Sequence, residues 1–236
     1  LPKDGKTYCL VARDSVKNAE GFLNFDPAAL SYIVEINSPL FYKVSSPAAY
    51  HDCVRMRSRS IYAADLVLNS EINSDCLFSI IVPLYKTPVS YFRDMVDSVV
   101  SQVYHNWELI LVNASPECVE LQKELDGLAD SRIKVITLEE NRGIAENTNA
   151  GIAAAVGDYV VFFDHDDTLD PFALYRYAER IQDCPDTDAL YCDEDFLNEA
   201  GEYVAPHFKS DFNLDLLRVH NYITHLLCVR ATFAKE

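Results

Sequence analysis

The stretch DYVVFFDHDDTLDP (residues 158–171) joins an unbroken apolar run to a cluster of carboxylates. The apolar run, residues 159–163, is short and rich in β-branched and aromatic side chains, which is typical of a fully buried strand. Asp164, Asp166 and Asp167 follow directly, and their mutual repulsion must be offset by a cation or a proton. In an open α/β sheet, ligands bind at the carboxyl ends of the strands. The stretch therefore predicts a buried strand that ends in a site for a hard divalent cation, shared with a phosphorylated ligand.

On both sides of this stretch, apolar runs of strand character alternate with segments of helical spacing. The predicted strands are 78–82, 107–112, 133–138, 159–163, 189–192 and one beginning in 222–229, and the predicted helices are 90–103, 119–129 and 144–156. A further helix is expected to begin at Pro171 with Asp170 as its N-cap, so Asp170 is left out of the cation site. Pro83 is expected to end the first strand of the series. This alternation predicts an α/β fold with a mostly parallel sheet flanked by helices.

The beginning of the chain lacks this alternation. Residues 1–76 are predicted to be an N-terminal accessory region, and residues 77–236 a single domain. Within the accessory region, strands are expected at 8–12 and 31–36 and a helix at 48–68.

Composition and charge restrict the class of protein. The chain has 236 residues, a hydrophobic fraction of 49% and a formal net charge of −17, which disfavours nucleic acid and anionic membrane surfaces as non-specific partners. Its seven cysteines are odd in number and include no C-x-x-C pair, which is typical of reduced thiols. We find no signal peptide and no apolar run of membrane-spanning length. We therefore expect a cytoplasmic protein, with peripheral membrane association through a longer parent protein left open.

Other interpretations of the acidic stretch compete with a cation site. One is a structural Asp-rich turn that caps a helix. Another is a haloacid-dehalogenase-like phosphotransferase, whose D-x-D-x-T pattern fits Asp164, Asp166 and Thr168. Three predicted strands precede the motif here, whereas in that family it usually ends the first strand. An EF-hand loop is excluded, because its sixth position is Leu169 instead of glycine and its twelfth is Tyr175 instead of glutamate.

A series of stretches in a fixed order carries a more extensive resemblance. The stretches are SIIVPLY (79–85), SVVSQVYHNWELILV (98–112), NRGIAENTNAGIAAAVGDYVVFFDHDD (141–167), YCDEDF (191–196) and PHFKSDFNLDLL (206–217). From Ser79 to about Arg230 the sequence resembles inverting glycosyltransferases of family 2, including bacterial cell-surface polysaccharide and rhamnan-type enzymes. The resemblance implies a GT-A fold, Mn²⁺ or Mg²⁺ as cofactor, and transfer of a sugar from a UDP- or dTDP-sugar to a saccharide or lipid-linked acceptor.

The resemblance assigns roles to the acidic stretch. Asp166 would hold the metal ion directly, Asp164 would lie toward the ribose and share the metal site, and Asp167 would support the site or contact the sugar. The ion would stabilise the charge that develops on the departing nucleoside diphosphate. His165 is left out of the ligand set, because strand alternation turns it to the opposite side.

The resemblance also implies a nucleotide site formed by the ends of the first two strands. Pro83 and Tyr85 would border the nucleobase, although Tyr85 also fits a core position. Asn113 stands where the family usually has a base-reading Asp, and Ser115 follows it. Asn offers both a donor and an acceptor, so uracil and thymine both stay open.

The loop and helix before the acidic stretch supply further donor contacts by resemblance. Arg142 would approach the nucleotide or its phosphates, with a surface arginine as the alternative. Gly143 permits the turn into the helix, and Asn149 matches an asparagine of the family. Both are also compatible with a purely structural role.

The acceptor side is the part that the resemblance leaves incomplete. An inverting transfer needs a general base, which the family supplies from an acidic motif after the strand predicted at 222–229. The chain stops at Glu236 before such a motif, so we expect a C-terminally truncated domain, and a nucleotide-binding module without transfer activity stays as the alternative.

Five acidic and histidine residues remain as candidates for this side. Asp193, Glu194 and Asp195 form the cluster left for acceptor or sugar contacts. His207 and His225 are candidates for metal or acceptor contacts, with ordinary packing as the alternative.

Overall fold

The computed structural model describes residues 34–35, 41–42, 72, 75–198 and 200–236. The chain divides into two compact units, residues 1–65 with 193–213, and residues 66–192 with 214–236. The strand predicted at 8–12 and the helix predicted at 48–68 lie outside the described residues. The predicted domain division at residue 76 therefore stays a prediction.

The described part of the first unit consists of two antiparallel strand pairs. The strands are β1 (Val34–Glu35), β2 (Phe41–Tyr42), β8 (Glu194–Leu197) and β9 (Tyr203–His207). β1 pairs with β2, and β8 pairs with β9 through a register shift between Glu194 and Phe196.

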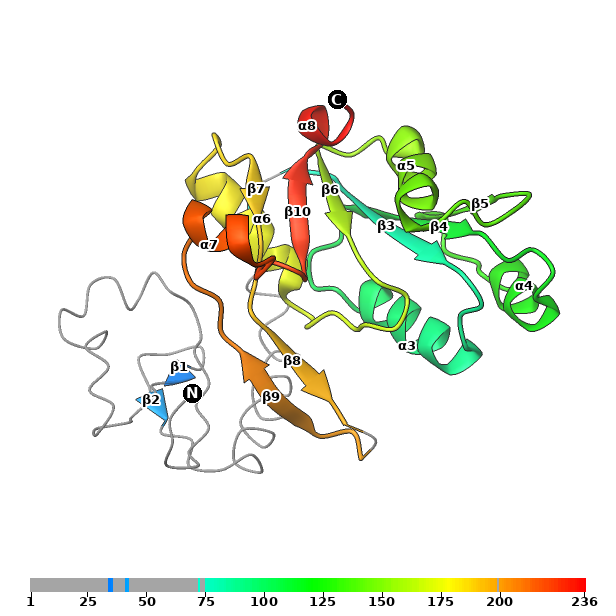
Figure 1. The fold of residues 1–236 in the computed structure, drawn as a ribbon, viewed down its shortest axis with the longest axis horizontal. Helices are drawn as coiled ribbons and strands as arrows, with labels where there is room; N and C mark the ends of the chain where they lie inside the picture. The colour runs from blue at the N-terminus through cyan, green and yellow to red at the C-terminus, as the bar shows by residue number, and fades with distance from the viewer. Residues whose placement is uncertain (1–33, 36–40, 43–71, 73–74, 199) are drawn as a thin grey trace. The chain divides into compact units, whose positions relative to one another are not determined.

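The described part of the second unit contains a six-stranded sheet of order β5-β4-β3-β6-β10-β7 (Figure 1). Its strands are β3 (Phe78–Leu84), β4 (Trp107–Asn113), β5 (Ile133–Thr137), β6 (Tyr159–Phe162), β7 (Ala189–Leu190) and β10 (Leu227–Arg230). β5, β4, β3 and β6 are parallel, whereas β10 is antiparallel to β6 and to β7. The predicted α/β fold with a mostly parallel sheet is confirmed.

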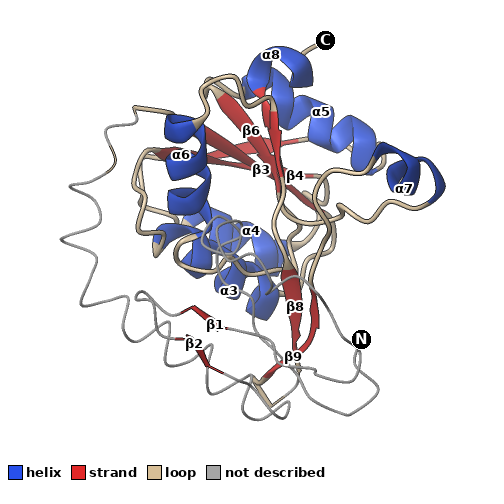
Figure 2. Cartoon of the chain, turned by 90° about the vertical axis from the view of Figure 1, so that its left-hand side faces the viewer, coloured by secondary structure: helices blue, strands red, loops and turns tan. Residues whose placement is uncertain are grey.

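Helices cover both faces of this sheet. The described helices of this unit are α3 (Val89–Val100), α4 (Val119–Asp126), α5 (Ile144–Ala154), α6 (Ala173–Asp183), α7 (Leu214–Val219) and α8 (Ala231–Ala234). α5 and α8 lie on one face, and α3, α4 and α6 on the other (Figures 1 and 2). α5 approaches the sheet closely at Gly151, where an added Cβ would lie 2.4 Å from Cγ2 of Ile81.

Two predicted boundaries were wrong. β3 continues through Pro83 to Leu84, because Pro83 faces the side on which β6 has already ended. Ile81 O accepts the N–H of Phe163 on that side, and β6 ends at Phe162, so the missing N–H of Pro83 costs no ladder bond. The other strands and helices end within a few residues of their predicted limits, except that β10 begins only at Leu227.

The helix predicted to begin at Pro171 begins instead at Ala173. A turn comes first, in which Asp170 Oδ1 accepts the N–H of Phe172 at 2.9 Å and the Asp170 carbonyl accepts the N–H of Ala173 at 2.9 Å. Asp170 is therefore not the N-cap of α6, which is Phe172, but its side chain holds the turn that precedes the helix.

The strand order creates a topological switch point at a defined place in the sheet. The chain passes from β3 through β4 to β5 at one edge, and then returns to the other side of β3 to form β6. The carboxyl ends of β3 and β6 therefore flank the point at which the connections change direction, where α/β sheets bind ligands. Tyr85 and Lys86 follow β3 at this edge, and Asp164 follows β6.

Candidate functional site

The carboxylates of the acidic stretch emerge directly from the buried core. Phe163 is still buried, and its N–H donates to Ile81 O at 3.1 Å, so β6 stays attached to β3 up to this residue. The side chains of Asp164 and Asp167 are half-exposed, and the N–H of Asp167 donates to Asp164 O at 3.4 Å in the turn that follows. The turn thus brings these two carboxylates to the same edge of the sheet.

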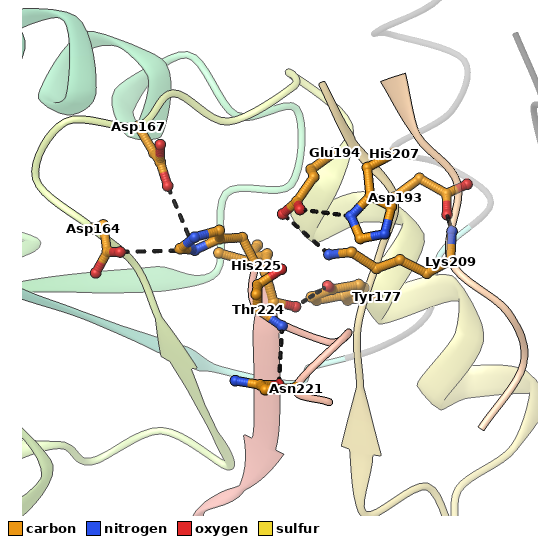
Figure 3. A network of polar contacts seen from close by, with 11 residues as sticks. Asp164, Asp167, Tyr177, Asp193, Glu194, His207, Lys209, Asn221, Thr224 and His225 are labelled. Carbon is orange, nitrogen blue, oxygen red and sulfur yellow. Dashed lines mark hydrogen bonds and ion pairs between the residues drawn. The ribbon is translucent and has the colours of Figure 1, made fainter. Parts of the chain in front are cut away.

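His225 joins these carboxylates from a distant part of the sequence. Its Nδ1 lies 3.8 Å from Asp164 Oδ2 and 3.6 Å from Asp167 Oδ2 (Figure 3). The cause is strand register: β10 is antiparallel to β6 with Leu227 opposite Phe162, so extending both strands by two residues brings His225 opposite Asp164.

The loop that carries His225 is held on both sides. Thr224 has a φ of 42°, uncommon for a β-branched residue, and its N–H donates to Asn221 Oδ1 at 3.4 Å. On the other side, the Tyr177 hydroxyl donates to Leu226 O at 2.6 Å (Figure 3). Sparsely populated backbone conformations persist where the surroundings impose them, and they are frequent at functional sites.

The arrangement is suited to a divalent cation. One ligand atom each from Asp164, Asp167 and His225 lies within 4.8 Å of the others. Two carboxylates and one imidazole suit a transition metal such as Mn²⁺, whereas Mg²⁺ prefers oxygen ligands alone. The chemistry of these donors therefore fits the expected cofactor, with Mn²⁺ favoured.

The other residues of the acidic stretch lie differently. Asp166 is exposed and is not part of the cluster formed by Asp164, Asp167 and His225, so its direct role at the metal stays a prediction. His165 is partly buried and likewise lies outside that cluster. The sequence alone indicated His225 only as an alternative to packing, because nothing in it shows which strand lies beside β6.

The end of β4 is buried and closely hydrogen-bonded. Asn113 and Ser115 are both fully buried, and Asn113 Oδ1 accepts the N–H of Ser115 at 3.0 Å. Asn113 Nδ2 donates to Gln122 Oε1 at 3.3 Å. Ser115 Oγ accepts the N–H of Lys86 at 3.1 Å, which ties the loop after β4 to the loop after β3.

The end of β3 presents an aromatic ring and a cation. Pro83 is half-buried within the strand, whereas 42% of Tyr85 is exposed. The ammonium of Lys86 lies 5.2 Å from the centroid of the Tyr85 ring. Exposure favours the surface interpretation of Tyr85 over a core position. Sequence reasoning missed Lys86, although a lysine directly after the strand that borders the site was a usable signal.

The loop before α5 is organised by asparagines. Gly143 has a φ of 91°, and its N–H donates to Asn141 Oδ1 at 2.9 Å. Asn147 is buried and donates from Nδ2 to the same Asn141 oxygen at 2.8 Å, while its own Oδ1 accepts the N–H of Arg142 at 3.3 Å. Asn149, which the sequence singled out, is exposed. Asn147 is thus the helix residue that shapes this loop.

The Arg142 side chain is 60% exposed at the start of α5, and its Nε lies 3.8 Å from Glu140 Oε1. This is a loose, solvent-exposed ion pair of little energetic weight. The guanidinium therefore has the freedom to meet a phosphate, as the sequence suggested.

The β8–β9 hairpin of the first unit holds a second charged network. Glu194 Oε1 lies 2.9 Å from His207 Nδ1, and Glu194 Oε2 accepts from Lys209 Nζ at 3.1 Å (Figure 3). The Lys209 side chain is fully buried. The backbone N–H of Lys209 donates to Asp193 Oδ1 at 2.7 Å. Asp193 and Glu194 thus have partners within the hairpin, and Asp195 is partly buried on β8.

Fold and site together define an α/β domain that presents a carboxylate–histidine cluster at the switch point of its sheet. The family model described as "Glycosyl transferase family 2" matches residues 79–229. The chain therefore belongs to glycosyltransferase family 2 and is a transferase by family. The alternative assignment as a haloacid-dehalogenase-like phosphotransferase is not favoured.

Curated relatives agree with this membership. The chain is 39% identical over 156 residues to "O-antigen biosynthesis protein RfbC" of Myxococcus xanthus, covering 65% of this chain and 12% of that protein. It is 38% identical over 162 residues to "Uncharacterized protein y4gI" of Sinorhizobium fredii, covering 68% of this chain and 18% of that protein. The chain thus spans less than a fifth of either relative.

Solved structures support the fold. Residues 1–349 of TarS from S. aureus, in complex with UDP-GlcNAc, match with a TM-score of 0.56 and 23% identity, covering 67% of this chain and 46% of that one. The same TarS fragment without that ligand matches with a TM-score of 0.53. The fold is GT-A. Among the helices that the structure describes, none has both the length and the apolar character needed to span a membrane.

Proposed function

We propose that this chain is the nucleotide-sugar-binding part of a metal-dependent, inverting glycosyltransferase of cell-surface polysaccharide synthesis. It takes a UDP- or dTDP-sugar as donor and a saccharide or lipid-linked molecule as acceptor, at the cytoplasmic side of the membrane. The observation that carries the proposal is the cluster of Asp164, Asp167 and His225 at the switch point of the sheet. The name of the relative RfbC, an O-antigen biosynthesis protein, supports the polysaccharide context.

The cluster would hold a divalent cation, with Mn²⁺ favoured over Mg²⁺ by the imidazole. When bound, the ion supplies positive charge for the diphosphate leaving group. Asp164 and Asp167 offer carboxylate oxygens from the turn after β6, and His225 offers Nδ1 from the loop before β10. The exposed carboxylate of Asp166 stays a proposed direct ligand.

The ends of β3 and β4 would bind the nucleoside. The exposed ring of Tyr85 offers a face on which a base can stack, next to Pro83. Asn113 and Ser115 set the shape of the neighbouring loop through their mutual hydrogen bond. Arg142, Gly143 and Asn149 at the start of α5 complete the proposed donor site, with the Arg142 guanidinium directed to the phosphates.

The acceptor side is assigned to the acidic cluster of β8. Both oxygens of Glu194 already have partners, His207 and Lys209, so its action as a base would require those contacts to break. Asp193 Oδ1 accepts the backbone N–H of Lys209 at 2.7 Å. Asp193 and Asp195 complete the acidic cluster that we propose to contact an acceptor hydroxyl.

Calorimetric titration tests the proposal. UDP, dTDP, UDP-GlcNAc and p-nitrophenyl phosphate are titrated into the chain with and without Mn²⁺, UDP-GlcNAc being included because the TarS fragment binds it. We expect nucleotide binding that requires Mn²⁺, and loss of that binding in Asp164→Asn. Asp94→Asn, which changes an exposed carboxylate of α3, is the matched control. Nucleotide binding that is indifferent to Mn²⁺, or no nucleotide binding at all, would contradict the proposal.

A further inference from the structure

Lys86 lies close to the switch point of the sheet, where β3 and β6 are neighbours. It follows β3 at the carboxyl edge, five residues beyond Ile81, which pairs with Phe162. Asp164 follows β6 at the same edge, two residues beyond Phe162. A lysine and the carboxylate cluster thus leave the sheet from neighbouring parallel strands, at the edge where ligands bind.

The backbone of Lys86 is held in a conformation that a lysine rarely adopts. Its φ is 51°, in the left-handed region that long side chains seldom occupy. Its N–H donates to Oγ of Ser115, and Ser115 is fully buried and hydrogen-bonded to Asn113. The ends of β3 and β4 therefore impose the conformation, and strain that is imposed in this way is frequent at ligand-binding positions.

The ammonium of Lys86 has a weak partner. It lies over the Tyr85 ring at 5.2 Å from the centroid, and Lys86 is exposed. No carboxylate in the described part of the chain forms an ion pair with it, whereas Arg142 is paired with Glu140. An exposed cation–π contact is readily exchanged for a charge-assisted hydrogen bond to a phosphate.

The occupied site needs a further positive charge, which the Lys86 ammonium can provide. A divalent ion offsets the charges of Asp164 and Asp167, and a bound diphosphate then adds negative charge that the ion alone does not balance. The chain carries a net charge of −17, so the positive charge of Lys86 at this edge stands against a predominantly acidic background.

We propose that Lys86 is a donor-binding residue: its ammonium moves from the face of the Tyr85 ring to the diphosphate when a nucleoside diphosphate binds. The inference rests on the proposed function, in which Tyr85 faces the base. Lys86 then has two effects. It binds the diphosphate in the complex, and it covers the ring face that the base needs while the site is free of nucleotide.

The test compares nucleotides with nucleosides. UDP, dTDP, uridine and thymidine are titrated with Mn²⁺ into wild type, Lys86→Gln, Lys86→Arg and the control Lys123→Gln, which changes an exposed lysine of α4. For Lys86→Gln we expect diphosphate affinity to fall about tenfold, while nucleoside affinity stays the same or rises. Lys86→Arg keeps the charge and should recover most of the diphosphate affinity, and Lys123→Gln should behave as wild type.

The outcomes separate this inference from the proposed function. Equal loss of diphosphate and nucleoside affinity in Lys86→Gln would mean that Lys86 only shapes the Tyr85 loop, and would overturn the inference. Unchanged affinity for both would overturn it as well. In either case, metal-dependent nucleotide binding by the wild-type chain would still support the proposed function. A wild-type chain that binds neither UDP nor dTDP would overturn the proposed function, and this inference with it.

Discussion

The two ends of the sheet hold carboxylates in opposite settings. At the amino end, Glu108 of β4 is buried and fully engaged: Oε1 accepts from Ser79 Oγ at 2.5 Å and from the N–H of Val156 at 2.8 Å, and Oε2 accepts from Lys134 Nζ at 2.6 Å. At the carboxyl end, Asp164 and Asp167 are half-exposed and share the imidazole of His225 at longer distances.

The difference separates structural from functional carboxylates. Glu108 receives its cation and its hydrogen bonds from the chain itself, so it stabilises the fold without any ligand. Burial raises the pKa of Glu108, but hydrogen bonds from Lys134 and Ser79 outweigh burial and hold this pKa below its ordinary value. Asp164 and Asp167 repel each other in the absence of a cation, which the fold tolerates because they are partly solvated.

Removal of Glu108 should give the largest effect. Glu108→Ala leaves the N–H of Val156 and the hydroxyl of Ser79 without their acceptor, which should cost about 3 kcal/mol in the free energy of unfolding. Urea denaturation measures it. Glu124→Ala is the control, because it removes only a solvent-exposed ion pair with Arg93 and should lower the free energy of unfolding far less. Equal losses in the two variants would show that the buried Glu108 network contributes no more stability than an exposed ion pair.

Low pH should remove part of the stability that the ionised Glu108 carboxylate contributes to the fold. Because its folded-state pKa lies below the ordinary value of 4.5, its contribution is complete above that pH and is lost as the pH falls through the folded-state pKa. The difference in stability between wild type and Glu108→Gln should therefore be constant from pH 7 to 5 and narrow below pH 4. A difference that stays constant to pH 3 would contradict the lowered pKa.

Removing a carboxylate at the carboxyl end of the sheet should raise the free energy of unfolding instead of lowering it. At pH 8 with EDTA, Asp167→Asn removes a negative charge close to Asp164, so the variant should be more stable than wild type by about 0.5 kcal/mol. Thermal unfolding measures this small gain. Loss of stability under these conditions would mean that Asp167 supports the fold as Glu108 does.

The fold and the carboxylates at the carboxyl end of the sheet were predicted from the sequence, whereas Glu108 was not. Apolar runs and helical spacing predicted the core strands and helices, because the central strands are buried on both faces. Pro83 misled the prediction, since its effect depends on where β6 ends beside it. Asp164 and Asp167 were found because carboxylates after a buried strand need an explanation in any fold.

The part of the site that the sequence did not predict depends on pairing between distant strands. His225 reaches Asp164 only because β10 lies antiparallel to β6 in one register, which neither segment encodes alone. Asn147 was passed over in favour of Asn149 for a similar reason: the hydrogen bonds of Asn147 to Asn141 and Arg142 follow from the loop geometry. Long-range pairing and loop geometry are the physical information that local patterns lack.

Binding of Mn²⁺ to the nucleotide-free chain tests the central claim most directly. Electron paramagnetic resonance of free Mn²⁺ is measured during titration into wild type, Asp167→Asn, His225→Ala and the control Asp94→Asn. We predict one Mn²⁺ site in wild type and in Asp94→Asn, with affinity lower by about tenfold or more in Asp167→Asn and His225→Ala. Equal Mn²⁺ affinity in all four proteins would contradict the claim that Asp164, Asp167 and His225 form a metal site.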